Sequence, residues 1–179
     1  MKRMIAVIGK GDAFQGSPDY EIAEKIGFTL IESGYRLVTG GLKGVMEAAS
    51  RGAQRAARHQ DGDVVGILPG FDAKEGNPYL DIALPTGLGL ARNVIVAASD
   101  AVIIIGGGAG TLSEAALAWQ MKRLLLAWRG TDSGWSARLA DAPLDSRERF
   151  PGRKEDRIFG FDTAGEAVSL IQKHLIKYL

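Results

Sequence analysis

The segment from Val102 to Glu114 constrains the fold more than any other stretch of the chain. Its first four residues, Val102 to Ile105, are all aliphatic, which is typical of a strand buried on both faces of a parallel sheet. Four of the next five residues are glycine, and Thr111 then begins an apolar run at helical spacing. A strand, a glycine turn and a helix bring bare backbone N–H groups and the positive helix end to one point. The segment therefore predicts either an anion-binding site or a tight turn without a ligand.

The rest of the chain alternates between short apolar runs and amphipathic ones. Further strands are expected at residues 4–8, 35–39, 64–68, 82–86, 123–128 and 158–161. Helices are expected at residues 18–33, 45–56, 88–98, 111–122 and 163–175. We predict an edge position for strand 82–86, because Pro85 has no N–H to donate. The pattern predicts a single Rossmann-like α/β domain over residues 1–179, a doubly wound, mostly parallel sheet of six or seven strands with helices on both faces, in three layers.

One segment departs from this alternation. Residues 129–157 are mostly charged or small, and they include Pro143 and Pro151. We expect an irregular insert there, which acts as a lid, as a partner surface, or as a mobile loop.

Composition excludes several classes of function. Lysine and arginine number 22 against 21 acidic residues, so the net charge of +1 gives no reason to expect nucleic-acid binding. The chain has no cysteine, and its two histidines, His59 and His174, are far apart, so no metal site is expected. The apolar runs have strand length, which argues against a membrane span and favours a cytoplasmic protein.

Four glycine-bearing loops follow predicted strands, at residues 9–16, 40–44, 86–89 and 106–110. In a doubly wound sheet, ligands bind beyond the carboxyl ends of the strands, so these loops are expected to converge on one site. The candidate ligand and phosphate contacts are Gly9, Gly40, Gly41, Lys43, Gly44, Thr86, Gly87, Asn93, Gly107, Gly108, Ala109, Gly110 and Thr111. A solvated side chain is the alternative for Lys43.

Standard phosphate fingerprints match poorly. Gly9-x-Gly11 lacks the third glycine of the dinucleotide motif, because Phe14 occupies that position, and Gly106-x-Gly108 meets Thr111 there. The chain contains no P-loop motif either.

Two other motifs do match a known family. Residues 107–114 resemble the G-G-x-G-T-x-x-E motif of the LOG family of cytokinin-activating phosphoribohydrolases, and residues 40–47 are similar to its second glycine-rich motif. Residues 66–70, 77–79 and 86–93 further resemble a molybdenum-cofactor-carrier-like branch of that superfamily. The resemblance covers residues 4–128 and implies the Rossmann-like fold.

The resemblance also implies site residues and a ligand. The arginine and glutamate that are held to be catalytic in LOG enzymes correspond to Arg92 and Glu114. This chain has Gly106 where those enzymes have proline, and Asn93 where they have lysine. The Asn93 difference favours the carrier-like branch, for which no cofactor is required and the molybdenum cofactor (molybdopterin) is the implied bound ligand.

Glutamate and arginine suit phosphate binding and N-glycosidic cleavage on chemical grounds, independently of the family resemblance. A carboxylate can stabilise the oxocarbenium-like state of N-glycosidic cleavage, and an arginine can hold a phosphate bidentately. The structural alternative for Glu114 is a capping box with Thr111, and for Arg92 it is a solvent-facing helix position.

Three functions remain open at this point. The first is a binding protein for a small phosphate-bearing, nucleotide-like molecule. The second is a phosphoribohydrolase acting on nucleoside 5′-monophosphates, and the third is an interaction scaffold with a vestigial pocket. Helix 88–98 is expected to pack on the sheet through Leu90, Ala91, Val94, Ile95 and Ala98. It carries more apolar residues than one stripe needs, which predicts a homodimer or a higher homo-oligomer through this helix, with helix 111–122 as a further candidate contact.

Overall fold

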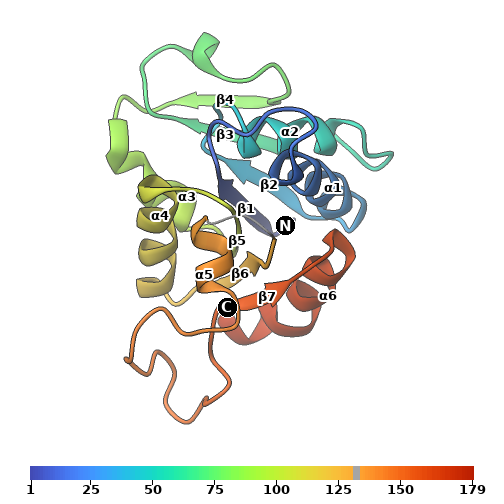
Figure 1. Ribbon diagram of the computed structural model, residues 1–179. Coiled ribbons are helices and arrows are strands. Elements are labelled where there is room, and N and C mark those ends of the chain that lie inside the picture. The colour runs from blue at the N-terminus through green and yellow to red at the C-terminus, as the bar shows by residue number, and fades with distance from the viewer. Residues whose placement is uncertain (131–133) are drawn as a thin grey trace.

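The computed structural model describes residues 1–130 and 134–179. In this part of the chain seven strands form one sheet of parallel neighbours, in the order β4-β3-β2-β1-β5-β6-β7 (Figure 1). Their bounds are β1 Met4–Gly9, β2 Arg36–Thr39, β3 Val64–Leu68, β4 Ile82–Pro85, β5 Ala101–Ile105, β6 Leu124–Trp128 and β7 Phe159–Phe161. The doubly wound α/β fold is confirmed, and β4 lies at an edge of the sheet as Pro85 indicated.

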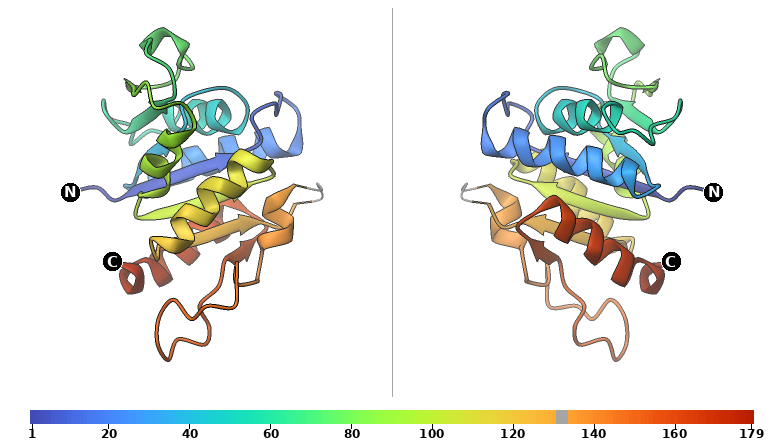
Figure 2. Two further views of the ribbon diagram at one scale, coloured as in Figure 1. Left: turned by 90° about the vertical axis from the view of Figure 1, so that its left-hand side faces the viewer. Right: turned by 90° about the vertical axis from the view of Figure 1, so that its right-hand side faces the viewer.

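Helices cover both faces of this sheet (Figure 2). One face carries α1 Pro18–Glu32, α2 Val45–Gln54 and α6 Ala164–His174. The other face carries α3 Asn93–Ala97, α4 Ala109–Gln120 and α5 Trp135–Leu139. Single 3₁₀ turns complete the described elements: η1 Ala73–Glu75, η2 Gly89–Arg92 and η3 Leu175–Tyr178. Each face has its own apolar core, and the fully buried side chains of β5 alternate between the two, with Ile103 on one side and Ile104 on the other.

The strand order reverses direction at β1, which lies between β2 and β5. Gly9 at the end of β1 is directly opposite Ile105 at the end of β5, and the N–H of Lys10 donates to the Ile105 carbonyl at 3.1 Å. The loops that follow these two strands therefore begin side by side. This is the point of an open α/β sheet at which a ligand crevice forms.

Two sequence predictions about helices are wrong. The helix after β5 begins at Ala109, not at Thr111, and its N-cap is Gly108. Thr111 thus lies inside the first turn and forms no capping box with Glu114. Glycine is accepted at the N-cap although it has no side chain to cap the helix. The helix therefore begins two residues earlier than the Thr111 pattern suggested.

The predicted helix 88–98 is divided into η2 and α3, and it buries a different face from the expected one. Arg92, Asn93, Val96 and Ala97 are buried, whereas most of the apolar stripe is exposed, including Leu90. A 3₁₀ turn has about 3.0 residues per turn, so it rotates the side chains away from the α-helical spacing used for the prediction.

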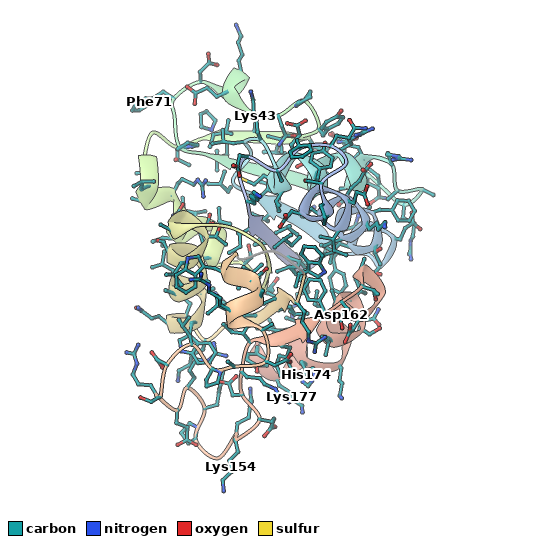
Figure 3. All side chains as sticks on the ribbon, viewed as in Figure 1. Lys43, Phe71, Lys154, Asp162, His174 and Lys177 are labelled. Atoms are coloured by element: carbon teal, nitrogen blue, oxygen red, sulfur yellow. The ribbon has the colours of Figure 1, made fainter. Side chains whose placement is uncertain are left out.

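The insert 129–157 contains α5 and is packed against α4; residues 131–133 of it lie outside the described residues. Arg149 is buried, donates to the carbonyls of Trp119 and Arg123, and pairs with Asp156 at 2.7 Å. Its guanidinium also lies 3.5 Å from the centre of the Trp119 ring. Lys154 projects from this loop at the end of the molecule opposite Lys43 and Phe71 (Figure 3).

Candidate ligand-binding site

A cavity of about 240 Å³ lies at the crevice between the ends of β1 and β5. It brings together residues that are more than a hundred positions apart in the sequence. Those predicted from the sequence are Gly9, Arg92, Asn93, Gly108, Gly110, Thr111 and Glu114. The remaining lining residues are Ile8, Gly11, Met46 and Leu90. The predicted convergence of the first and central glycine loops therefore holds.

Arg92 and Glu114 form an ion pair in the wall of this cavity. The Arg92 Nη1 donates to Glu114 Oε1 at 2.5 Å and to Asn93 Oδ1 at 2.7 Å. Both residues are buried, with exposed fractions of 9% for Arg92 and 7% for Glu114. Neither structural alternative from the sequence holds, since Arg92 does not face solvent and Glu114 bonds to Arg92.

Burial raises the pKa of Glu114 above its ordinary value of 4.5, and the charge and hydrogen bond of Arg92 offset part of this effect. The Arg92 Nε is buried and has no hydrogen-bond partner among the described residues. The pair thus combines a carboxylate that favours protonation with a guanidinium that keeps an unused donor. An incoming anion would compete with Glu114 for Arg92.

Gly40 lies behind the guanidinium. A Cβ at Gly40 would lie 2.5 Å from Arg92 Nη2 and 2.9 Å from its Cζ. Only a residue without a side chain lets the loop after β2 approach Arg92 this closely. The backbone of Gly40 therefore packs against the Arg92 guanidinium, although Gly40 is not among the residues that line the cavity.

The start of α4 supplies the third component. Its N-cap, Gly108, makes no side-chain cap, and Gly108, Ala109 and Gly110 are exposed. A Cβ at Gly108 or Gly110 would meet no atom within 4 Å, so both glycines leave open space in front of the backbone. The first N–H groups of a helix lack intrahelical acceptors, and here they adjoin the cavity that holds Arg92.

Other predicted contacts lie outside the lining of the cavity. Thr86 donates to the Leu68 carbonyl at 2.7 Å, and Gly87 has a positive φ of 65° in a turn beside Phe71. Three further glycines shape neighbouring loops: Gly107 lies beside the Thr111 side chain, Gly41 beside Leu68, and Gly44 beside Lys10 and Gly11. The last two predicted contacts are exposed, Ala109 at the first position of α4 and Lys43 in the loop before α2.

Sequence reasoning missed the apolar part of the cavity. Ile8 and Met46 line it although they were expected to serve only the strand and the helix that carry them. Leu90 also lines it and has an exposed fraction of 86%. Their positions in the sequence were the available signal, because Ile8 ends the apolar run of β1 and Met46 lies two residues after the second glycine loop.

A larger hollow of about 360 Å³ lies between α1 and α2, lined by helix side chains such as Glu24, Phe28 and Arg55. It has no glycine loop, and two of its charged groups, Arg55 and Glu24, pair with each other at 2.7 Å. The described residues contain no group of three or more potential metal-ligating side chains. None of the described helices has the length and apolar character needed to cross a membrane.

Comparison with known proteins identifies relatives that share this fold. The sequence model of the SLOG cluster4 family matches residues 2–149. A protein of Archaeoglobus fulgidus is 45% identical over 122 aligned residues, with 66% of this chain and 75% of that protein covered. The molybdenum cofactor binding protein from the phototrophic bacterium Rippkaea orientalis is 34% identical, with 97% of each chain covered and a TM-score of 0.77. The molybdenum cofactor carrier protein from Chlamydomonas reinhardtii is 28% identical over 98% of this chain and 99% of that one, with a TM-score of 0.74.

Proposed function

We propose that this chain, which belongs to the SLOG cluster4 family, binds a small phosphate-bearing, nucleotide-like molecule, and that this ligand is the molybdenum cofactor. The observation that carries the proposal is the meeting of Arg92 with the uncapped start of α4 in one cavity. A guanidinium and a helix N-terminus are two of the groups that proteins use most to hold phosphate.

The cavity suits a pterin that carries a phosphate at one end. The phosphate would lie at the backbone of Gly108 to Thr111, within reach of Arg92. Ile8, Met46 and Leu90 provide the apolar side chains that a flat ring system can cover. The likeness to two proteins described as binding or carrying the molybdenum cofactor supports the pterin over other phosphate esters.

Gly108→Val tests the anion site directly. The φ of Gly108 is −112°, outside the left-handed region that favours glycine, and a Cβ there meets no protein atom, so we expect the variant to fold. Its side chain would occupy the place of the anion, so binding of inorganic phosphate, measured by calorimetric titration, should be lost. Gly165→Val is the control, because Gly165 lies in the first turn of another helix, α6, and also has open space in front of it.

Absence of an anion at the start of α4 would contradict the proposal. A crystal grown in ample phosphate would show only water at the start of α4, and Gly108→Val would titrate like the control. Purified protein examined for fluorescent bound pterin would then also be empty.

The second candidate function is phosphoribohydrolase activity, and the burial of Glu114 beside Arg92 favours it. Glu114 provides a carboxylate in the cavity wall, beside the proposed phosphate site, and such a carboxylate would stabilise the oxocarbenium-like state of nucleoside 5′-monophosphate cleavage. Incubation with purine and pyrimidine 5′-monophosphates, followed by chromatography for free base, separates the two functions. Release of base that disappears in Glu114→Gln would establish the hydrolase. A protein that neither binds nor cleaves would leave the scaffold role.

We also propose that the protein is a homodimer that uses η2 and α3. Leu90, Val94 and Ile95 are exposed on these two short elements, and so is Leu88, which directly precedes η2. A helix that is apolar on its outer side is usually covered on that side as well.

A further inference from the structure

The glycine loop that leads into α4 is hydrogen-bonded to α5, an element of the insert. The N–H of Gly106 donates to Ser136 Oγ at 2.8 Å, and the N–H of Ser136 donates back to the Gly106 carbonyl at 3.1 Å. The N–H of Trp135 donates to the Gly107 carbonyl at 3.2 Å. Ser136 has an exposed fraction of 2% and does not line the cavity. Its hydroxyl thus serves the loop and not the ligand.

The conformation of this loop needs such support. Gly106 and Gly107 both have positive φ, 58° and 89°, and the place of a Cβ at Gly106 is taken by Asp19 Oδ1. Consecutive glycines have the largest backbone freedom of any residues, so they do not hold a conformation by themselves. A proline at position 106 would provide stiffness, but it could neither adopt this φ nor donate to Ser136.

The approach of α5 to the loop is close enough to be specific. A Cβ at Gly134 would lie 2.7 Å from both the Cα and the carbonyl carbon of Gly106. Residues 134–136 are therefore in backbone contact with the loop, thirty positions along the chain from it. Any shift of α5 moves Gly106 and Gly107, and with them the start of α4.

We propose that Ser136 is a positioning residue of the ligand site: by fixing Gly106 and Gly107 it directs the N–H groups at the start of α4 toward the anion. The inference rests on the proposed function, because the anion at the start of α4 is part of that proposal. The insert thereby sets the affinity of a site that it does not touch.

The test compares Ser136→Ala with Ser146→Ala, an exposed serine of the same insert. In the ligand-free protein, amide hydrogen exchange of residues 106–110, followed by NMR, should become faster in Ser136→Ala alone. The dissociation constant for inorganic phosphate should rise roughly three- to tenfold, the equivalent of one lost hydrogen bond. Gly134→Ala should produce both effects, because its Cβ would push α5 away from Gly106.

Each outcome decides the matter. Unchanged exchange in Ser136→Ala overturns the positioning role, and faster exchange with unchanged phosphate affinity shows that the hydrogen bond is structural only. A wild type whose phosphate does not bind at the start of α4 overturns the proposed function, and the positioning role with it. If Ser136→Ala fails to fold, Ser136→Cys keeps the shape with a weaker acceptor and should give the same effects at smaller size.

Discussion

Arg92 and Glu114 are buried together, and each provides the counter-charge of the other. A buried ion pair adds little stability compared with apolar residues, because both ions lose their hydration. Removing one partner is different, since it leaves a buried charge without compensation. The pair should therefore show strong energetic coupling in variants.

Arg92→Ala should lower the free energy of unfolding by about 3 kcal/mol or more, because the buried Glu114 then either keeps a charge without a partner or takes up a proton at neutral pH, and both cost free energy. The same change made in a Glu114→Gln background should cost clearly less, as a neutral amide needs no counter-charge. Urea unfolding of the two single variants and the double variant measures this coupling. Additive losses would mean that the ion pair does not form in solution.

If the site binds an anion as proposed, Glu114 should make that binding depend on pH. Burial raises the pKa of Glu114, and an anion that takes Arg92 removes the contact that partly lowers it. We therefore expect binding to be accompanied by proton uptake, so affinity should rise as the pH falls from neutral toward acidic values. Sulfate is the suitable probe, because its charge does not change over this range. In Glu114→Gln the affinity for sulfate should be higher at neutral pH and nearly independent of pH; a wild-type profile in this variant would exclude Glu114 as the titrating group.

At the scale of elements, Asp81 holds the edge strand β4 in place. Its carboxylate accepts from the N–H of Val64 at 2.9 Å and from Gln54 Nε2 at 2.7 Å, and it hydrogen-bonds His59 at 2.9 Å. Burial acts to raise the pKa of Asp81, but these hydrogen bonds outweigh it and leave the pKa below the ordinary value of 3.8. One side chain thus joins β3, the start of β4 and the end of α2.

Asp81→Asn should destabilise the protein by about 1–3 kcal/mol at neutral pH, because an amide cannot accept all the hydrogen bonds that the largely buried carboxylate accepts. A depressed pKa gives stability that is present above the unfolded-state value and is lost as the pH falls through the folded-state value. The difference between wild type and Asp81→Asn should therefore shrink below about pH 3.8. Urea titrations at several pH values measure it, with the exposed Asp61→Asn as control. A difference that stays constant down to the lowest pH would contradict the assignment.

Strands were easier to predict than helix ends. Runs such as Val102 to Ile105 are buried on both faces, so composition alone identifies them. The start of α4 was misplaced because Gly108 caps the helix without a recognisable side chain. The buried side of α3 was misjudged because Arg92, a charged residue, faces inward to meet Glu114, and hydrophobic spacing cannot reveal such a pair.

At the scale of the whole molecule, the convergence of loops could be predicted because parallel strands end at one edge. This placed Gly9, Arg92 and Glu114 in one cavity from sequence alone. The contribution of the insert could not be predicted, because the contact between Gly106 and Ser136 depends on how α5 packs and leaves no periodic pattern.

The molecule leaves one apolar surface uncovered on the α3 side of the sheet. Val94 and Ile95 of α3 have exposed fractions of 43% and 40%. Leu84 of β4, which is 47% exposed, is paired with Ile67, whose side chain belongs to the core on that same side. Exposed apolar residues gathered on one side of a protein mark an interaction surface more often than isolated ones do.

If a second copy covers this surface, a charge placed on it should separate the copies. We expect light scattering to report a dimer for the wild type at micromolar concentration and a monomer for Ile95→Glu, because burying an unpaired carboxylate costs more than the contact gains. Phe28→Glu is the matched control: Phe28 is 42% exposed on α1, on the opposite face of the sheet, and its replacement should leave the dimer intact. A monomeric wild type refutes the dimer, and a dimer that survives Ile95→Glu but not Phe28→Glu would move the interface to α1.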